Sequence, residues 1–472
     1  MWGKAAFAAV SLVLVLPGCG SSDDASGTSI GGSSAGLGGD AGVGGSAGST
    51  SGGSGAAPTG GAAGAQSGGA GGSAGAGGSG STGGSAGASG QTLLRVHYRT
   101  DTMTHIGLRG EGAGLSWDVS TTLTESSAGV WELGFQDLQS GLQFKPVLEG
   151  AAGDVTWPKG ASFSNWLLEP GETLDVYPFF LADRGRLESL QINHPDGPRD
   201  VVVYLPPSYD EPGAVDKRYR LLILQDGQNL FDENAFFGGW RLQESLDALF
   251  AKGQVVSPSA GQVSWEGGSA EELIVAGVFN AGAGRLYEYT PTNASVPGLC
   301  DAQVETCGGG AAEYLQFVID SVAPALRGRY RTASTRMGFG GSSLGGLLSL
   351  QACWTHSESF DRCLIHSPSL WWDSEWAVNT LVAGAEPGDP LKLYVDAGTQ
   401  SDGLDLVRQL NTDLQTHGFT TGANLWCLEG VGMAHNELAW AERAPWGIYF
   451  AYADPQRAQP AATLPSSLRA CQ

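Results

Sequence analysis

The second half of the chain alternates between two patterns of apolar and polar positions. Short runs there are too hydrophobic for strands with one wet face, which is typical of strands buried on both sides of a parallel sheet. Segments with helical spacing separate them, so residues 185–455 are predicted to form a doubly wound α/β domain with a mostly parallel sheet. The apolar runs are RDVVVYLPP, RLLILQDG, EELIVAGVFNAG, RMGFGGSS, DRCLIHSPS, LKLYVDAG and ANLWCLEG. The helical segments are Arg241–Ala251, Ala311–Arg327, Leu344–Thr355, Leu404–Thr416 and Glu437–Phe450.

Residues 91–184 show a different rhythm, in which short alternating runs rich in aromatic and β-branched residues lie between Gly-rich turns. This pattern predicts a small antiparallel β-sandwich. The domain resembles the sandwich modules attached to carbohydrate-active enzymes. Tryptophans on its surface would bind sugar rings, whereas buried ones would only pack the core. The candidates are Trp117, Trp131, Trp157 and Trp166.

The two ends of the chain are predicted to lie outside both domains. Residues 1–19 carry Lys4 and then an apolar run that ends in LPGC, which resembles a lipoprotein signal peptide with Cys19 as the lipid-modified residue. A plain signal peptide remains the alternative. Residues 20–90 are almost entirely Gly, Ser and Ala, so we expect a disordered linker that tethers the folded part. Residues 456–472 are expected to form a C-terminal tail.

Composition narrows the possible partners of the chain. It has 472 residues, 25 Lys+Arg against 48 Asp+Glu, and a formal net charge of −23. That balance argues against binding to nucleic acids or to anionic membrane surfaces, both of which need basic patches.

The cysteines fit an exported protein. Of the seven cysteines, six remain when Cys19 is set aside, and an even number suggests disulfides. Cys300 and Cys307 flank a short loop, and Cys353 and Cys363 bracket a helix-to-strand turn, so both pairs are predicted to be bridged. Cys427 either pairs with Cys471 or stays a buried thiol. No CxxC pair is present, so the sequence supports no metal site, and it suggests no cofactor.

A nucleophile motif is the sharpest chemical signal. Gly341-Ser342-Ser343-Leu344-Gly345 matches G-x-S-x-G between an expected strand and an expected helix. A sharp turn there would expose Ser343 Oγ at the edge of the sheet, and the backbone N–H of Leu344 would lie at a helix N-terminus, where it can stabilise an oxyanion.

A catalytic serine needs a base, and four histidines follow Ser343. His356 ends the elbow helix, His366 precedes any acid on a later strand, and His417 occupies the last turn of a helix. His435 lies in a Gly-rich loop after the last expected strand, which is where a doubly wound hydrolase places its histidine. The sequence therefore indicates His435 as the base.

The acid should follow the strand LKLYVDAG. Asp396 still belongs to that strand, and Asp405 falls in the first turn of a helix, where a carboxylate merely stabilises the helix. Asp402 lies in the loop between them and can turn back toward His435. We expect Asp402 to be the acid, with Asp405 as the alternative.

Further residues are expected around the mouth of the site. The loop after an earlier strand, QDGQNLFD, supplies the second oxyanion donor, for which we select the backbone N–H of Gln228. Arg285, Trp371 and Trp372 are candidate substrate-binding residues. Each has an equally weighted structural alternative, namely core packing or an ion pair such as Arg285 with Glu288.

These motifs together resemble a known group of enzymes. YLPPSYD, LQDGQNLFD, GGW, RLYEYTP, GGSSLGGLLSL, SPSLWWD and GMAHNELAW are similar, in this order, to the putative-esterase family of α/β hydrolases. That family includes enterochelin esterases, esterase D (S-formylglutathione hydrolase), feruloyl and acetylxylan esterases and mycobacterial mycolyltransferases. The resemblance covers about residues 185–452. It implies an α/β-hydrolase fold, Ser343 as nucleophile, His435 as base and the amide of Gln228 as oxyanion donor. The family's acid often occupies the position of Ser401, one residue before Asp402.

The resulting hypothesis is a lipid-anchored, exported serine esterase that acts on a siderophore, a carbohydrate ester or a small ester. Acyl transfer of the mycolyltransferase type is the chemical alternative. A non-catalytic surface protein that binds carbohydrate through the sandwich is the alternative from another class. Residue 20 is not the Asp that favours retention in the inner membrane, so attachment to the outer membrane is slightly favoured over secretion.

Overall fold

The computed structural model describes residues 91–160, 165–252, 254–257, 261–264, 270–300, 304–457 and 463–472. The signal peptide, the lipid-modified Cys19 and the linker expected over residues 1–90 lie outside the described residues. Within the described ranges, no helix combines the length and the apolar composition that a bilayer-spanning segment needs.

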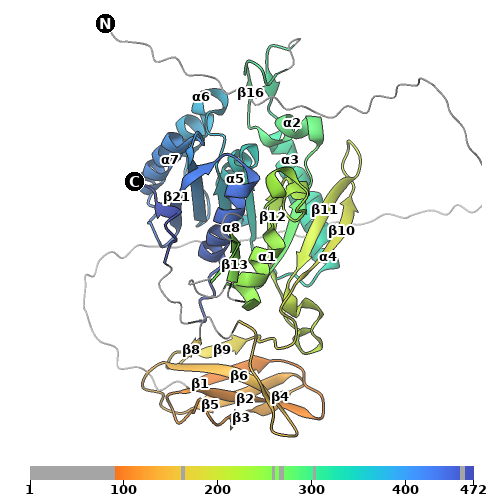
Figure 1. Cartoon of the computed structure of the whole chain (residues 1–472), viewed down its shortest axis with the longest axis vertical. Helices are drawn as coiled ribbons and strands as arrows, with labels where there is room; N and C mark the ends of the chain where they lie inside the picture. The colour runs from red at the N-terminus through yellow and green to blue at the C-terminus, as the bar shows by residue number, and fades with distance from the viewer. Residues whose placement is uncertain are drawn as a thin grey trace, which may run out of the picture. The chain divides into compact units, whose positions relative to one another are not determined.

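Residues 92–176 form two small sheets around a shared apolar core (Figure 1). The first has the order β4-β5-β1-β9, with strands Thr124–Ser127, Val130–Phe135, Thr92–His97 and Thr173–Val176. The second contains β3 (Thr121–Thr122), β2 (Thr104–Glu111), β6 (Leu142–Gly150), β7 (Val155–Thr156) and β8 (Trp166–Leu168). Leu94 and Val96 from one sheet pack against Ile106, Leu108 and Phe144 from the other.

This sandwich departs from the expected all-antiparallel pairing at one place. β1 and β9 pair in parallel, from Leu93 with Thr173 to Val96 with Val176. The long connection between them runs through the strands of both sheets, which gives the chain the length that a parallel pair requires. Of the four tryptophans, Trp131 and Trp166 are buried in the core and Trp157 is exposed.

The larger sheet has nine strands in the order β10-β11-β15-β12-β18-β19-β20-β21-β22. Neighbouring strands from β15 to β21 are parallel, whereas β10, β11 and β22 join antiparallel at the two edges. This crossover order is that of an α/β hydrolase. The strands are β10 (Arg186–Ile192), β11 (Arg199–Leu205), β15 (Leu273–Val278), β12 (Arg220–Gln225), β18 (Met337–Ser342), β19 (Phe360–His366), β20 (Lys392–Gln400), β21 (Leu425–Ala434) and β22 (Leu468–Ala470).

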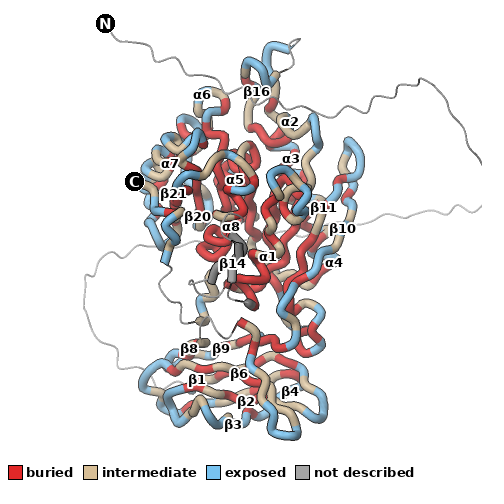
Figure 2. Tube along the Cα trace, viewed as in Figure 1, coloured by how far each residue is buried: buried red, intermediate tan, exposed pale blue. Residues whose placement is uncertain are grey.

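Helices cover both faces of this sheet, which explains why its central strands are apolar on both sides. Leu222 and Leu224 of β12 pack with α1 and α8, whereas Ile223 between them faces the cluster that holds α3, α4, α5 and α7. Figure 2 shows α5 and α8 buried beside the strands. The helices are α1 (Leu242–Asp247), α2 (Arg285–Tyr289), α3 (Ala311–Phe317), α4 (Ala323–Arg329), α5 (Leu344–Thr355), α6 (Trp372–Trp376), α7 (Leu404–Thr416) and α8 (Glu437–Tyr452).

The described residues also contain three disulfides. Cys300 bonds to Cys307 and Cys353 to Cys363, which are the two pairs that the sequence predicted. Cys427 bonds to Cys471, so of the two alternatives left open for Cys427 the structure has the bridge. This third bond links β21 to the residue after β22.

Candidate active site

Ser343 lies at the sharp turn between β18 and α5, with φ 60° and ψ −121°. A non-glycine residue reaches this backbone conformation only under strain, and its neighbours have to leave room for it. A Cβ atom on Gly341 would lie 3.1 Å from the carbonyl carbon of Gly345. A Cβ atom on Gly346 would lie 2.7 Å from the carbonyl oxygen of His366. The glycines therefore permit the close approach of strand and helix that lifts Ser343 Oγ out of the sheet edge.

His435 stands opposite this serine, just after β21 and before α8. Its Nε2 atom lies 2.9 Å from Ser343 Oγ, and its Nδ1 atom lies 2.5 Å from Asp402 Oδ1. Because a carboxylate only accepts hydrogen bonds, Nδ1–H donates to Asp402 and Nε2 is left to accept from the serine hydroxyl. Asn436 caps α8 through a hydrogen bond from the backbone N–H of Ala439, and the ring of Trp440 packs edge-on against the imidazole.

Asp402 rather than Asp405 reaches the histidine. Ser401 turns the chain back after β20 with a positive φ of 50°, and this turn carries Asp402 toward His435. The side chain of Asp405 is 99% exposed and pairs with Arg408 on the surface of α7. Asp396 also points elsewhere, because its carboxylate accepts from His366 Nδ1 at 2.6 Å.

The second carboxylate oxygen of Asp402 is fully engaged by the protein. Oδ2 accepts hydrogen bonds from the backbone N–H of Gly398 at 2.5 Å and from Ser367 Oγ at 2.7 Å, and Arg443 Nη2 lies 3.4 Å away. The Asp402 side chain is completely buried, while 35% of the His435 side chain is exposed. Donors on one side therefore fix the carboxylate in the orientation in which its other oxygen meets His435.

The loop after β12 approaches the same region and is held rigidly. Asp226 adopts a left-handed conformation with φ 57°, and its carboxylate forms a bidentate ion pair with Arg285 at 2.7 and 2.8 Å. Asn280 Nδ2 donates to Asp226 Oδ1 at 2.7 Å, and the backbone N–H of Asn280 donates to Gln228 Oε1 at 3.3 Å. A Cβ atom on Gly227 would lie 2.3 Å from the Gly277 carbonyl oxygen, so only glycine fits there.

The backbone N–H groups of two residues, Gln228 and Leu344, are candidates for binding an oxyanion. Gln228 lies in the single helical turn Gly227–Asn229, and Leu344 is the first residue of α5. First-turn N–H groups have no intrahelical acceptor, and the helix dipole places partial positive charge at the N-terminus of α5. Both positions agree with the sequence-based selection of Gln228 and Leu344, whose role stays a prediction.

A sequence model of the family described as "Putative esterase" matches residues 192–448, which is more than half of the chain. The chain belongs to the putative esterase family. A siderophore triacetylfusarinine C esterase of Aspergillus fumigatus is 38% identical over 91 residues, which are 19% of this chain and 28% of that protein. A siderophore enterobactin esterase of Emericella nidulans is 40% identical over 68 residues, or 14% and 22% of the two chains. These alignments thus span less than a third of either curated relative.

A solved structure of the siderophore hydrolase EstA from Aspergillus nidulans is also similar to this esterase-family chain. It is 21% identical, the match covers 56% of this chain and 93% of that one, and the TM-score is 0.42.

The substrate-binding residues expected in this family member need one correction. Trp372 is completely buried, and its Nε1–H donates to the carbonyl and hydroxyl oxygens of Thr292, so it is a core residue. Its neighbour Trp371 is 44% exposed and remains a candidate. The structural alternative for Arg285, an ion pair, is present, but its partner is Asp226 rather than the example Glu288, which pairs with Arg199 at 2.6 Å.

The Asp226 carboxylate keeps Arg285 charged. Burial would lower the pKa of the Arg285 guanidinium, but the adjacent carboxylate outweighs burial and raises that pKa above its usual value. Arg285 therefore holds the loop of Gln228 in place as a permanent cation, with about a quarter of its side chain (26%) exposed.

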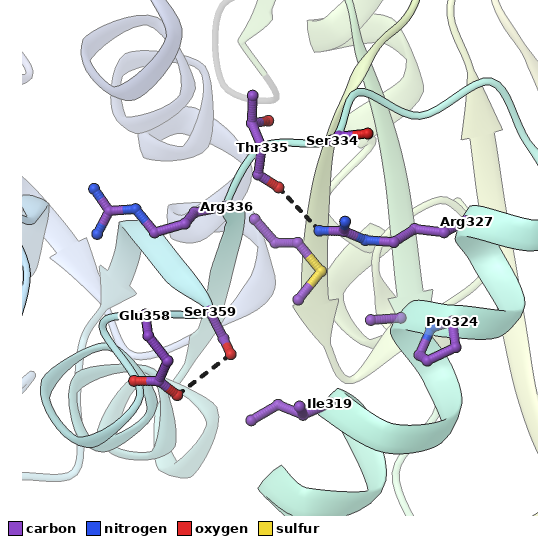
Figure 3. Close-up of a pocket in the computed structure, with 10 residues that line it drawn as sticks. Ile319, Pro324, Arg327, Ser334, Thr335, Arg336, Glu358 and Ser359 are labelled. Carbon is purple, nitrogen blue, oxygen red and sulfur yellow. Dashed lines mark hydrogen bonds between the residues drawn. The ribbon is translucent and has the colours of Figure 1, made fainter. Parts of the chain in front are cut away.

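The described part of the chain also has a cavity of about 370 Å³ (Figure 3), and Ser343 is not among the residues that line it. Figure 3 shows Arg327 reaching across it to the carbonyl oxygen of Thr335, with Arg336 and Glu358 on the far side. Met337, the first residue of β18, lines it, whereas Ser343 follows the last residue of that strand. A six-residue strand spans about 20 Å, so this cavity does not belong to the site.

Sequence reasoning missed four polar residues that hold the site together, namely Asp226, Asn280, Ser367 and Arg443. One of them had a visible signal. Arg443 is the one basic residue of the mostly apolar helix ELAWAERAPWGIYFAY, and a charge in such a position needs a buried partner. Within the described residues no group of three or more His, Cys, Asp or Glu side chains is arranged to hold a metal ion.

Proposed function

We propose that this member of the putative esterase family is a serine ester hydrolase in which Ser343, His435 and Asp402 form the catalytic triad. The observation that carries the proposal is the unbroken chain of hydrogen bonds from Ser343 Oγ through His435 to Asp402. It lies where β18, β20 and β21 end, and ligands of open α/β sheets bind at the carboxyl ends of the strands.

The proposed reaction has two halves. Ser343 Oγ attacks the ester carbonyl while His435 Nε2 takes its proton, and the same proton then passes to the departing alcohol. Water deprotonated by His435 next attacks the acyl-serine and releases the acid. Asp402 stays ionised throughout and stabilises the imidazolium that forms in each half.

The backbone N–H groups of Leu344 and Gln228 are proposed to stabilise the negative charge that develops on the carbonyl oxygen. Two features support this assignment. Leu344 opens α5, whose dipole favours an anion, and the loop of Gln228 is fixed by the ion pair of Asp226 with Arg285. Donors that do not have to reorganise during the reaction contribute most to such stabilisation.

A siderophore ester is the substrate class that we propose first. Both curated relatives named above carry the description of siderophore esterases, and their short alignments are 38% and 40% identical to this chain. Carbohydrate esters and small esters are the other classes to be compared. Trp371, which is partly exposed, is proposed to contact the substrate.

The proposal can be tested with a panel of esters. The purified protein is assayed with p-nitrophenyl esters, feruloyl sugars and a catechol lactone, each at several concentrations. Ser343→Ala is expected to lower kcat by about 10⁴–10⁶ on every ester that the wild type cleaves. Ser359→Ala, at the cavity near the start of β18, is the matched control and should leave kcat unchanged. Turnover by Ser343→Ala at the wild-type rate would refute the hydrolase assignment, and a clear preference for another ester class would refute the siderophore assignment.

A further inference from the structure

A group of charged side chains lies completely buried behind the proposed triad. His366, Asp396 and Arg443 each have no exposed surface. Arg443 Nε lies 3.1 Å from Asp396 Oδ1, and Arg443 Nη2 lies 3.4 Å from Asp402 Oδ2. One guanidinium is thus shared by two carboxylates, and only one of these carboxylates contacts His435.

Ser367 joins these groups. Its hydroxyl accepts hydrogen bonds from Arg443 Nη2 at 2.6 Å and from Trp440 Nε1 at 2.9 Å, and donates its own to Asp402 Oδ2 at 2.7 Å. Ser367 has a positive φ of 40°, which is strained for a residue with a side chain. Its backbone N–H donates to the backbone oxygen of Asp396 at 2.9 Å. Because Arg443 and Trp440 both donate to the Ser367 hydroxyl oxygen, the hydroxyl proton is directed to Asp402 Oδ2.

The charges of the group can be assigned. Burial would raise the pKa of Asp396, but Arg443 and His366 outweigh it and hold that pKa below its usual value, so Asp396 is ionised. His366 donates from Nδ1 to Asp396, and no hydrogen-bond acceptor in the described residues reaches its buried Nε2 atom. The Arg443 guanidinium faces Asp396 and Asp402 as the buried cation of this group.

One more acid interacts electrostatically with His435. Glu437, in the first turn of α8, is nearly buried and accepts from Asn229 Nδ2 at 3.2 Å. Burial raises its pKa, with a further contribution from Asp226, while His435 and Arg285 act in the opposite direction. Glu437, Asp226 and Arg285 are unchanged in every variant below, so their effect on His435 is constant.

We propose that Arg443 is a positioning residue of the triad, which orients Asp402 through Ser367, and that Asp396 holds Arg443 in place and offsets its charge at His435. This inference rests on the proposed function, because it assigns a role to groups that act through His435. It accounts for a buried arginine that would otherwise only add the cost of removing a charge from water.

Opposite charges make opposite predictions for the pH dependence. Removing the cation in Arg443→Met should favour protonated His435 and move the acidic limb of the pH–rate profile to higher pH. Removing the anion in Asp396→Asn should move the limb to lower pH. Unit charges a few side chains away in a protein interior shift such a midpoint by about one pH unit. The double variant should return close to the wild-type midpoint, and Arg443→Lys, which keeps the charge, should shift it by only a few tenths.

The readout is the rate of covalent labelling by a fluorophosphonate between about pH 5 and pH 9, which requires a reactive Ser343 but no knowledge of the substrate. Arg327→Met, at the remote cavity, is the matched control and should keep the wild-type profile. If Arg443→Met does not fold, Asp396→Asn decides the matter, since it leaves Arg443 paired with Asp402 and should still move the midpoint to lower pH.

Failure of this inference can be distinguished from failure of the proposed function. If folded Asp396→Asn loses labelling rate but keeps the wild-type midpoint, the residues are merely structural and the inference is wrong. If the wild type itself is not labelled at Ser343, the proposed function fails before the inference is reached.

Discussion

At the scale of single residues, the backbone decides which carboxylate can serve as the proposed catalytic acid. Sequence position alone left Asp402 and Asp405 as alternatives, because both follow the same strand by a few residues. The structure separates them through the backbone, since the left-handed Ser401 reverses the chain before α7 begins at Leu404. Asp402 is then buried and held by three donors, whereas Asp405 projects into solvent.

The two acids should therefore respond differently to the same substitution. Asp402→Asn is expected to lower kcat by about 10³–10⁴, because His435 keeps a nitrogen base but loses the charge that orients it. Asp405→Asn removes a charge at the N-terminus of a helix and should leave kcat within about twofold. Both are measured by steady-state kinetics on one ester at matched thermal stability. A crippled Asp405→Asn beside an active Asp402→Asn would show that the acid is misassigned.

The ion pair of Arg285 with Asp226 makes a second prediction at this scale. Arg285→Met should release the loop that carries Gln228 and lower kcat by about 10–10²-fold, somewhat less than the loss of one oxyanion donor. Arg241→Met breaks a surface pair with Glu244 on α1 and is the matched control. The kinetics are read as kcat against KM on a neutral ester. A change in KM alone would mean that Arg285 contacts the substrate rather than the loop.

At the scale of elements, apolar patterning predicted the central strands and the helices α5 and α7 well. Helix α5 is buried on nearly all sides and is a nearly continuous apolar run, whereas α7 buries only Val407, Leu410 and Leu414, which recur at helical spacing. The helix expected over Ala311–Arg327 is instead α3 and α4 joined by a π-helical turn, Val318–Val322. Pro324 follows this turn and cannot donate the next hydrogen bond, which explains the wider turn before it.

The C-terminal tail is the main element that patterning missed. The stretch has few apolar residues, so its pairing depends on β21 rather than on its own sequence. Leu468–Ala470 form β22 against Leu428–Gly430, and the bond of Cys427 with Cys471 fixes this edge. Part of the expected tail over residues 456–472 is thus an edge strand of the sheet.

Loop length gives this disulfide a measurable effect. The bond of Cys427 with Cys471 spans 44 positions, and the bond of Cys300 with Cys307 spans 7. Loop-closure entropy predicts that replacing both cysteines by serine lowers the free energy of unfolding by about 4 kcal/mol in the first case and about 2 kcal/mol in the second. Urea denaturation of each double variant under non-reducing conditions checks this order. An equal or smaller loss for the longer loop would contradict a role of the bridge in holding β22.

At the scale of the whole molecule, the alternation of strands and helices along the chain was predictable, because each element leaves its own apolar pattern in the sequence. The inner contacts of the site were not, because Ser367, Asn280 and Arg443 come from distant segments and meet only in the fold. Lipid attachment rests on residues 1–19 alone, whereas export rests on these residues and on the even number of the remaining cysteines, and both remain a proposal.

That proposal has a direct test in the native host. Metabolic labelling with a clickable fatty acid should tag the wild type and fail to tag Cys19→Ala, because Cys19 is the proposed acceptor of the lipid. Fractionation of the two forms would show whether attachment follows the tag. Equal labelling of both forms would refute the lipoprotein assignment and leave the esterase assignment untouched.

Residues 20–90 are expected to tether the folded part of the chain and to make no contribution to catalysis. They are mostly Gly, Ser and Ala and offer few apolar side chains to a core. A chain that begins at Gln91 is expected to keep the wild-type kcat and KM on a soluble ester, as measured beside the full-length protein. A collapse of kcat would mean that this segment contributes to the folded enzyme.

Mapping of a covalent adduct tests the central claim most directly. The full-length protein is incubated with a fluorophosphonate, digested, and analysed by mass spectrometry to locate the modified residue. We expect one adduct per chain, on Ser343, with labelling lost in Ser343→Ala and slowed in His435→Ala. An adduct on another serine such as Ser342, or no adduct in a protein that still cleaves esters, would contradict the proposed triad.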